Sequence, residues 1–136
     1  MHDACALIRI MVLAGPVGNI DGRRDADRFW QQFPGEGVDV TVAVELDECL
    51  SRLGRYRYDA FVLDLTAPGR SLPELAYLRK DREGLLAFVL IDATDASVGH
   101  WVIHHGAAAC FDIKCYNADM IRNIIRDTVL KRSETA

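Results

Sequence analysis

The chain alternates between short apolar runs of strand length and segments whose apolar residues recur three and four apart. The first and fourth runs are almost continuously apolar, which favours strands covered on both faces, as in a parallel sheet. The second is rich in β-branched residues with partial alternation, which indicates a position nearer a sheet edge. Strands are predicted over residues 7–13, 38–44, 58–65, 85–91 and 109–113.

The segments between these runs predict helices over 21–33, 46–53, 73–79, 97–106 and from 118 onward. Asp21 and Asn117 are predicted N-caps, and Pro73 suits the first turn of a helix. Gly54 and Gly106 are predicted to end theirs. Strands that alternate with helices imply right-handed crossovers and a doubly wound α/β sheet.

In such folds ligands bind where the strands end at their carboxyl termini. Asp64 stands out among these positions, because a strand-length apolar run ends in this carboxylate and a Thr-Ala-Pro-Gly turn follows. We therefore expect Asp64 at the rim of the sheet, in a candidate pocket. The other strand ends that should meet there are Ala14, Gly15, Asp92, Thr94 and Lys114.

Composition narrows the class of protein. With 136 residues, we expect one domain over 1–136 with its core at about 7–132. A formal charge of −4 and a pI near 5.5 argue against nucleic-acid binding. No apolar segment approaches the roughly 20 residues of a membrane span, and the first residues lack the pattern of a signal peptide. We expect a cytoplasmic protein whose cysteines are reduced and mostly buried, including Cys110, with Cys115 in a loop.

Several of these motifs resemble the receiver domain of two-component response regulators. Residues 58–65 are similar to the strand that carries the phosphoacceptor aspartate, here Asp64. Gly106-Ala107, Phe111 and Lys114 are similar to the Gly-Ala pair, switch aromatic and lysine of that family. The resemblance implies a flavodoxin-like (βα)5 three-layer sandwich with a five-stranded parallel sheet in the order 2-1-3-4-5. It also implies that a histidine kinase could phosphorylate Asp64.

The sequence departs from that family at the site. Ala14 and Gly15 stand where receivers carry the acidic pair that holds Mg²⁺, which leaves Asp64, with Asp92 as a replacement, as the candidate metal ligands. Asp92 or Ala93 stands where a hydroxyl residue is expected, with Thr94 one or two places late. A salt bridge from Lys114 to Asp64 or Asp92 would relieve the repulsion between these carboxylates. Cys115 replaces the usual proline after the lysine, so we expect a trans peptide bond there.

We therefore expect a signalling module rather than an enzyme: an atypical receiver in two-component or phosphorelay signalling. It would act by contacts with a histidine kinase or another signalling protein, through the fourth helix, fifth strand and fifth helix near Trp101 and Arg122. Magnesium-dependent phosphorylation at Asp64 would be weak or absent. The alternatives are a phosphorylated receiver that uses Asp64 with Asp92 and Lys114, and a small flavodoxin-like ligand-binding protein. A fused output or kinase domain and a homodimer are compatible with the sequence.

One further pair of side chains has a spacing that could bind a metal ion. His100 and His104 lie four residues apart on a predicted helix, a spacing that can hold zinc. No H-E-x-x-H motif accompanies them, so we interpret them as an exposed polar face of that helix.

Overall fold

The structure is a computed structural model, and it describes residues 7–15, 35, 37–67, 69–80, 82, 84–92 and 96–135. The predicted helix over 21–33 and Thr94 lie outside these residues. Within them, all five predicted strands and the other four predicted helices are confirmed. The strands are β1 (Ile8–Leu13), β2 (Val38–Ala43), β3 (Ala60–Asp64), β4 (Leu86–Ile91) and β5 (Ala109–Asp112). The helices are α2 (Leu46–Arg55), α3 (Pro73–Arg79), α4 (Ala96–His104) and α5 (Ala118–Thr135).

Two glycines predicted to end helices behave differently. Gly106 has a φ of 99°, a conformation that side chains rarely adopt, and it follows α4 as predicted. The prediction for Gly54 was wrong, because this residue lies inside α2. The helix continues two residues beyond its predicted end, to Arg55, and the backbone N–H of Tyr56 donates to the carbonyl of Arg52.

The five strands form one parallel sheet in the order β2-β1-β3-β4-β5, as the resemblance implied. β2 is therefore an edge strand, as its composition indicated. Leu13 of β1 pairs with Leu63 of β3, so the next residue, Ala14, comes beside Asp64. Asp64 itself pairs with Leu90 of β4, one residue before that strand ends.

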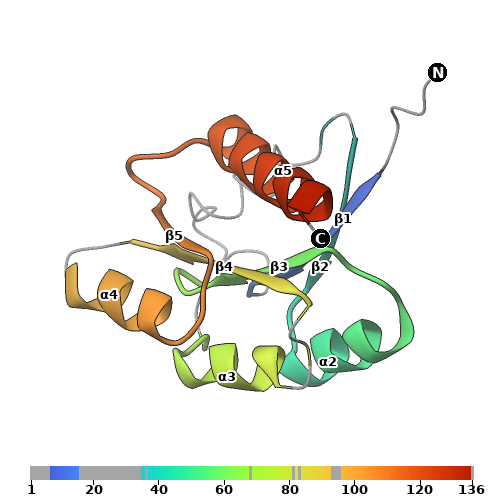
Figure 1. Cartoon of the computed structure of the whole chain (residues 1–136). Helices are drawn as coiled ribbons and strands as arrows, with labels where there is room; N and C mark the ends of the chain where they lie inside the picture. The colour runs from blue at the N-terminus through green and yellow to red at the C-terminus, as the bar shows by residue number, and fades with distance from the viewer. Residues whose placement is uncertain are drawn as a thin grey trace.

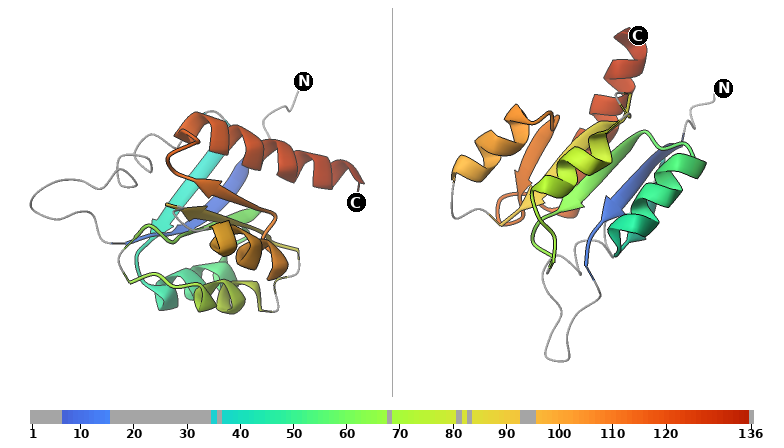
Figure 2. Two further views of the ribbon diagram at one scale, coloured as in Figure 1. Left: turned by 90° about the vertical axis from the view of Figure 1, so that its left-hand side faces the viewer. Right: turned by 90° about the horizontal axis from the view of Figure 1, so that it is seen from below.

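Helices cover both faces of the sheet. Figure 1 shows α5 on one face and α2, α3 and α4 on the other, and the two views in Figure 2 agree. Ala60 and Val62 of β3 pack in the cluster beneath α5, whereas Phe61 and Leu63 pack in the cluster beneath the other three helices. Burial on both faces explains why β3 is apolar at every position before Asp64.

Asn117 caps α5 as predicted, since its Oδ1 accepts a hydrogen bond from the backbone N–H of Met120 at 2.8 Å. Replacing Asn117 with alanine should lower the free energy of unfolding by about 1 kcal/mol, because that N–H loses its acceptor. Urea denaturation measures the change. Asn123→Ala is the matched control, because Asn123 is an exposed residue within the same helix. Equal losses in the two variants would show that the cap contributes nothing.

Candidate functional site

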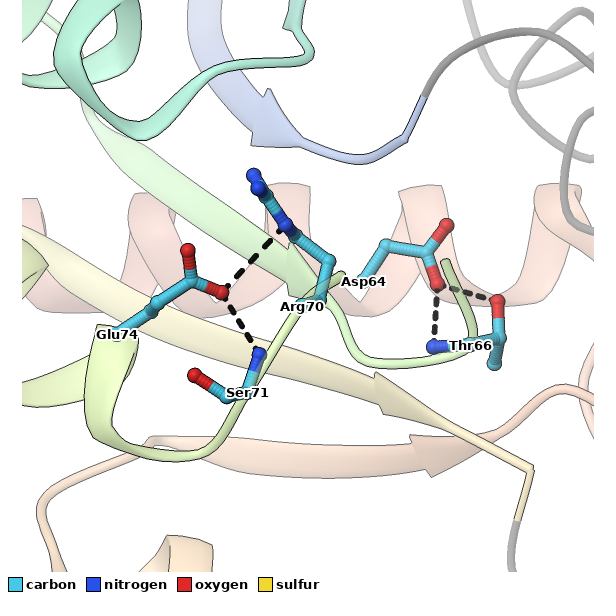
Figure 3. Close-up of polar contacts among 5 residues, drawn as sticks. All are labelled: Asp64, Thr66, Arg70, Ser71 and Glu74. Carbon is cyan, nitrogen blue, oxygen red and sulfur yellow. Dashed lines mark hydrogen bonds and ion pairs between the residues drawn. The ribbon is translucent and has the colours of Figure 1, made fainter. Parts of the chain in front are cut away.

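Asp64 ends β3, as predicted, and its carboxylate is buried, with 0% of the residue exposed. Its Oδ1 accepts hydrogen bonds from the backbone N–H of Thr66 at 2.9 Å and from the Thr66 hydroxyl (Figure 3). The following loop turns back at once, because Ala67 N–H donates to the carbonyl of Asp64 and Arg70 N–H donates to that of Ala67. The predicted position of Asp64 at the end of its strand is therefore confirmed.

A buried ion pair that the sequence analysis did not identify joins this loop to the first turn of α3. Arg70 Nε lies 3.5 Å from Glu74 Oε1, and the two side chains are only 10% and 11% exposed. That oxygen also accepts a hydrogen bond from the backbone N–H of Ser71 at 2.8 Å (Figure 3). Two sequence signals could have revealed this arrangement: Ser71 and Glu74 at capping-box spacing around Pro73, and Arg70 and Glu74 four residues apart.

Arg70 has further hydrogen-bonding capacity. Within the described part of the chain, its buried Nε and Nη1 atoms have no hydrogen-bond acceptor in suitable geometry. Buried donors normally find acceptors, and leaving one without a partner costs about 1 to 3 kcal/mol. The guanidinium therefore has Glu74 as its counter-charge and retains N–H groups that could donate to a further acceptor.

Lys114 forms a salt bridge with Asp92, which is one of the two partners predicted for it. Lys114 Nζ lies 3.1 Å from Asp92 Oδ1, with both side chains at least half exposed. The hydrogen bond and the charge of Asp92 raise the pKa of Lys114, so the lysine stays protonated throughout the neutral range. Because the pair is exposed to solvent, it adds little to stability.

Phe111, the predicted switch aromatic, is buried. Its ring stacks on Phe88 with centroids 6.1 Å apart and meets Tyr116 edge-on at 5.3 Å. Through these contacts β5 packs against β4 and against the loop that follows β5. Among the described residues there is no cis peptide bond, so the bond before Cys115 is trans, as predicted.

The described residues at this end of the sheet do not provide the ligands that a divalent cation needs. Ala14 and Gly15 are buried beside Asp64 and bring no carboxylate. Asp64 binds Thr66, whereas Asp92 pairs with Lys114, so the two candidate ligands belong to separate contacts. No group of three or more His, Cys, Asp or Glu side chains in the described part of the chain is placed to hold a metal ion.

The predicted partner-binding region needs one correction. Arg122 was expected on an exposed face, but its side chain is only 15% exposed and pairs with Asp119 at 2.7 Å. It also lies against Gly35, where an added Cβ would come within 2.9 Å of the guanidinium. Trp101 is half-buried and stacks on His105, with ring centroids 3.7 Å apart.

The histidine and cysteine predictions are largely confirmed. His100 and His104 are exposed, as expected for a polar helix face. Burial raises the pKa of Cys49 to about 12, and burial with the nearby Asp112 carboxylate raises that of Cys110 to about 11. Both thiols therefore stay protonated at neutral pH. Cys115 is exposed in the loop after β5, whereas Cys110 is half-buried rather than fully buried.

No protein-family model matches the sequence, and no curated protein matches it. Among the described residues, no helix combines the length and apolar character that a membrane span requires. The architecture is that of a doubly wound α/β domain, with Asp64, Asp92 and Lys114 at or just after the carboxyl ends of strands.

Solved structures resemble this one over nearly the whole chain. A CheY-like response regulator receiver domain from Methanospirillum hungatei JF-1 has a TM-score of 0.73 and 18% identity, covering 96% of this chain and 99% of that one. The receiver domain of the Francisella response regulator 1452 has a TM-score of 0.71 and 20% identity, covering 93% and 98%. A signal receiver domain from Pseudomonas fluorescens Pf-5 reaches a TM-score of 0.75 at 12% identity, covering 99% and 96%. The chain has the fold of response regulator receiver domains.

Proposed function

We propose that the chain is an atypical receiver domain, over residues 1–136, that serves two-component or phosphorelay signalling through protein–protein contacts. Magnesium-dependent phosphorylation at Asp64 is weak or absent in this proposal. The observation that carries it is the state of Asp64: a fully buried carboxylate, bound by Thr66, beside Ala14 and Gly15 that supply no metal ligand. The fold supports the receiver class, and the pocket supports its atypical character.

The contact surface that we propose lies on α4, β5 and α5. Ile103 on α4 is 48% exposed, and Met120 and Ile124 on α5 are 44% and 37% exposed. These large apolar side chains come from the two helices that follow β4 and β5, and β5 is an edge strand whose outer side has no neighbouring strand in the sheet. Exposed apolar side chains near a strand edge favour association with another protein.

The partner in this proposal is a histidine kinase or another signalling protein. One similar structure is described as a sensor protein from Polaromonas, and the receiver from Pseudomonas fluorescens belongs to an HD domain-containing protein. The second description supports a fused domain as the partner, and a separate kinase or a fused kinase domain is proposed on the receiver fold alone. A second copy of the chain is a further candidate for the same surface.

Binding to purified histidine kinases of the source organism tests the surface. Ile103→Glu and Met120→Glu should each weaken binding at least tenfold, because a charge replaces a buried apolar contact in the complex. Tyr77→Glu is the matched control, since Tyr77 is 58% exposed on α3, away from this surface. Asp64→Asn should bind as the unaltered protein does. A loss on Asp64→Asn equal to that of Ile103→Glu would contradict the proposal.

A second candidate function is a phosphorylated receiver that uses Asp64 with Asp92 and Lys114. The contact between Lys114 and Asp92, at the same end of the sheet as Asp64, favours it. Incubation with acetyl phosphate and Mg²⁺ followed by intact-mass analysis separates the two candidates. A phosphate mass that Asp64→Asn abolishes would establish this second function. A small flavodoxin-like ligand-binding protein would instead show thermal stabilisation by a nucleotide or flavin.

A further inference from the structure

The amino end of the sheet, opposite the end where Asp64 lies, carries a pocket of about 220 Å³. In the right-hand view of Figure 2 the strand arrows point away from the C-terminal end of α5. The pocket lies at that end, because its lining comes from the loop before β3, the start of β4 and the last turns of α5: Arg57, Tyr58, Asp59, Leu86, Val129 and Arg132.

Two lining residues are held in place by β1. Asp59 Oδ2 accepts a hydrogen bond from the backbone N–H of Arg9 at 2.9 Å, and the backbone N–H of Asp59 donates to the carbonyl of Arg9 at 2.8 Å. Tyr58 is only 9% exposed, and the Arg9 guanidinium lies 5.0 Å from the centre of its ring. The pocket therefore has a fixed wall, in which one oxygen of the Asp59 carboxylate already has a partner.

The side chains that line the pocket carry a net positive charge. Arg57 and Arg132 bring two guanidinium groups, and Asp59 brings one carboxylate. Both arginines are exposed to solvent. Arg132 lies in the last turn of α5, where the helix carbonyls favour a cation, but Arg57 lies outside the described helices, so the same explanation does not apply to it. One carboxylate cannot neutralise two guanidinium groups, so the lining keeps one positive charge.

The size and polarity of the pocket indicate the class of its occupant. Small-molecule and cofactor sites usually measure about 300–1,000 Å³ and are lined mainly by apolar side chains. This pocket is smaller, and three of its lining residues are charged. A guanidinium can bind a carboxylate through two parallel hydrogen bonds, which gives the pair both energy and a defined geometry. The pocket therefore suits the carboxylate of an acidic side chain better than a nucleotide or a flavin.

A second pocket, of about 200 Å³, lies on the neighbouring end of α2 and is also basic. Its lining includes Arg52, Arg55 and Tyr56. Glu48 lines it too and pairs with Arg52 at 3.6 Å, so Arg55 supplies the charge that Glu48 does not balance. Arg55, Tyr56 and Arg57 are consecutive in the chain, so one short segment joins the two pockets. A peptide with several carboxylates can therefore contact both.

We propose that these two pockets at the amino end of the sheet bind a short acidic segment of a partner protein. Arg57 and Arg132 bind one carboxylate, and Arg55 binds a neighbouring one. Two pockets with one net positive charge each suit a few carboxylates rather than the closely spaced phosphates of a nucleic acid. The surface does not include Ile103 or Met120, so the inference goes beyond the proposed function and does not depend on it.

Fluorescence anisotropy with a labelled hexaglutamate peptide and the full chain tests the proposal. The peptide should bind, and a hexaglutamine peptide of the same length should not. Arg57→Gln and Arg132→Gln should each weaken binding about fivefold, because each removes one solvent-accessible charge contact. Arg126→Gln is the matched control, since it makes the same charge change on α5 at a residue outside the pocket lining. It should change the affinity by less than about twofold.

Chemical-shift mapping on the unaltered protein needs no variant. During titration of the ¹⁵N-labelled chain with hexaglutamate, the backbone amide shifts should concentrate in residues 55–59, 84–86 and 129–132. Shifts that concentrate instead around Asp64 or Ile103 would overturn the proposal, because the peptide would then bind another surface.

Three results of the binding assay would also overturn it. The first is no binding of hexaglutamate by the unaltered protein. The second is an equal loss of affinity in Arg126→Gln and Arg57→Gln, which would show attraction to overall charge rather than to the pocket. The third is tighter binding of an oligothymidine of equal charge with the same dependence on Arg57, which would make the surface a nucleic-acid site.

Discussion

Replacing Phe88 with alanine should lower the free energy of unfolding by about 3 to 5 kcal/mol. Phe88 is fully buried in β4, and its ring stacks on Phe111 of the edge strand β5 at an interplanar angle of 16°. The truncation removes buried apolar surface and leaves a cavity between the sheet and α5, because the neighbouring strands cannot collapse into the space. Urea denaturation measures the loss. The slope of the unfolding free energy against urea concentration should stay the same as in the unaltered protein.

Tyr77→Ala is the control for this truncation, because it removes an aromatic ring that is 58% exposed. It should change stability by less than about 0.5 kcal/mol, as surface substitutions usually do. A loss of that small size in Phe88→Ala would mean that β5 does not pack on β4 as the structure describes.

The second large effect is expected at the buried ion pair. Glu74→Gln should destabilise the protein by about 3 kcal/mol, because it leaves the Arg70 guanidinium buried without its counter-charge. Glutamine preserves the shape and retains an oxygen that can accept from Ser71 N–H, so the loss reports mainly on charge. The control is Glu48→Gln, which removes a partly exposed partner of Arg52 at the same i,i+4 spacing and should cost less than about 1 kcal/mol.

A double-mutant cycle isolates the pair itself. Arg70→Met with Glu74→Gln should cost less than the sum of the two single changes, because neither charge is then left alone. Additive losses would show that Arg70 and Glu74 do not interact across the 3.5 Å that separates them.

Strands and helices were the most predictable features of this chain. Five apolar runs flanked by polar turns identified each strand of the described residues to within two residues, because burial on both faces leaves little choice of residue along β1, β3 and β4. Gly106, which follows α4, was predictable because the positive φ needed there excludes most other residues. Gly54 has no such requirement, and the pattern of its neighbours alone did not reveal that the helix runs through it.

The candidate site was only partly predictable. The position of Asp64 followed from the end of an apolar run, but its burial depends on the path of a loop that periodicity does not describe. Lys114 had two carboxylates within plausible reach, and the structure shows it paired with Asp92. Arg70 was missed because arginine in a turn normally lies in solvent, and only the three-dimensional arrangement of Glu74 and Ser71 shows it to be buried.

The strand order described above also governs how the chain must fold. β1 pairs with β2 through Ile8 and Val38, which are 30 residues apart, and with β3 through Ile10 and Ala60, which are 50 apart. No pair of neighbouring strands in this parallel sheet can form as a hairpin, so each pairing requires the closure of a long loop. The centre of the sheet, including the strand that carries Asp64, is therefore assembled from distant segments. Folding should be slower than that of a helical bundle of equal length, because the native contacts of the sheet join residues far apart in the sequence.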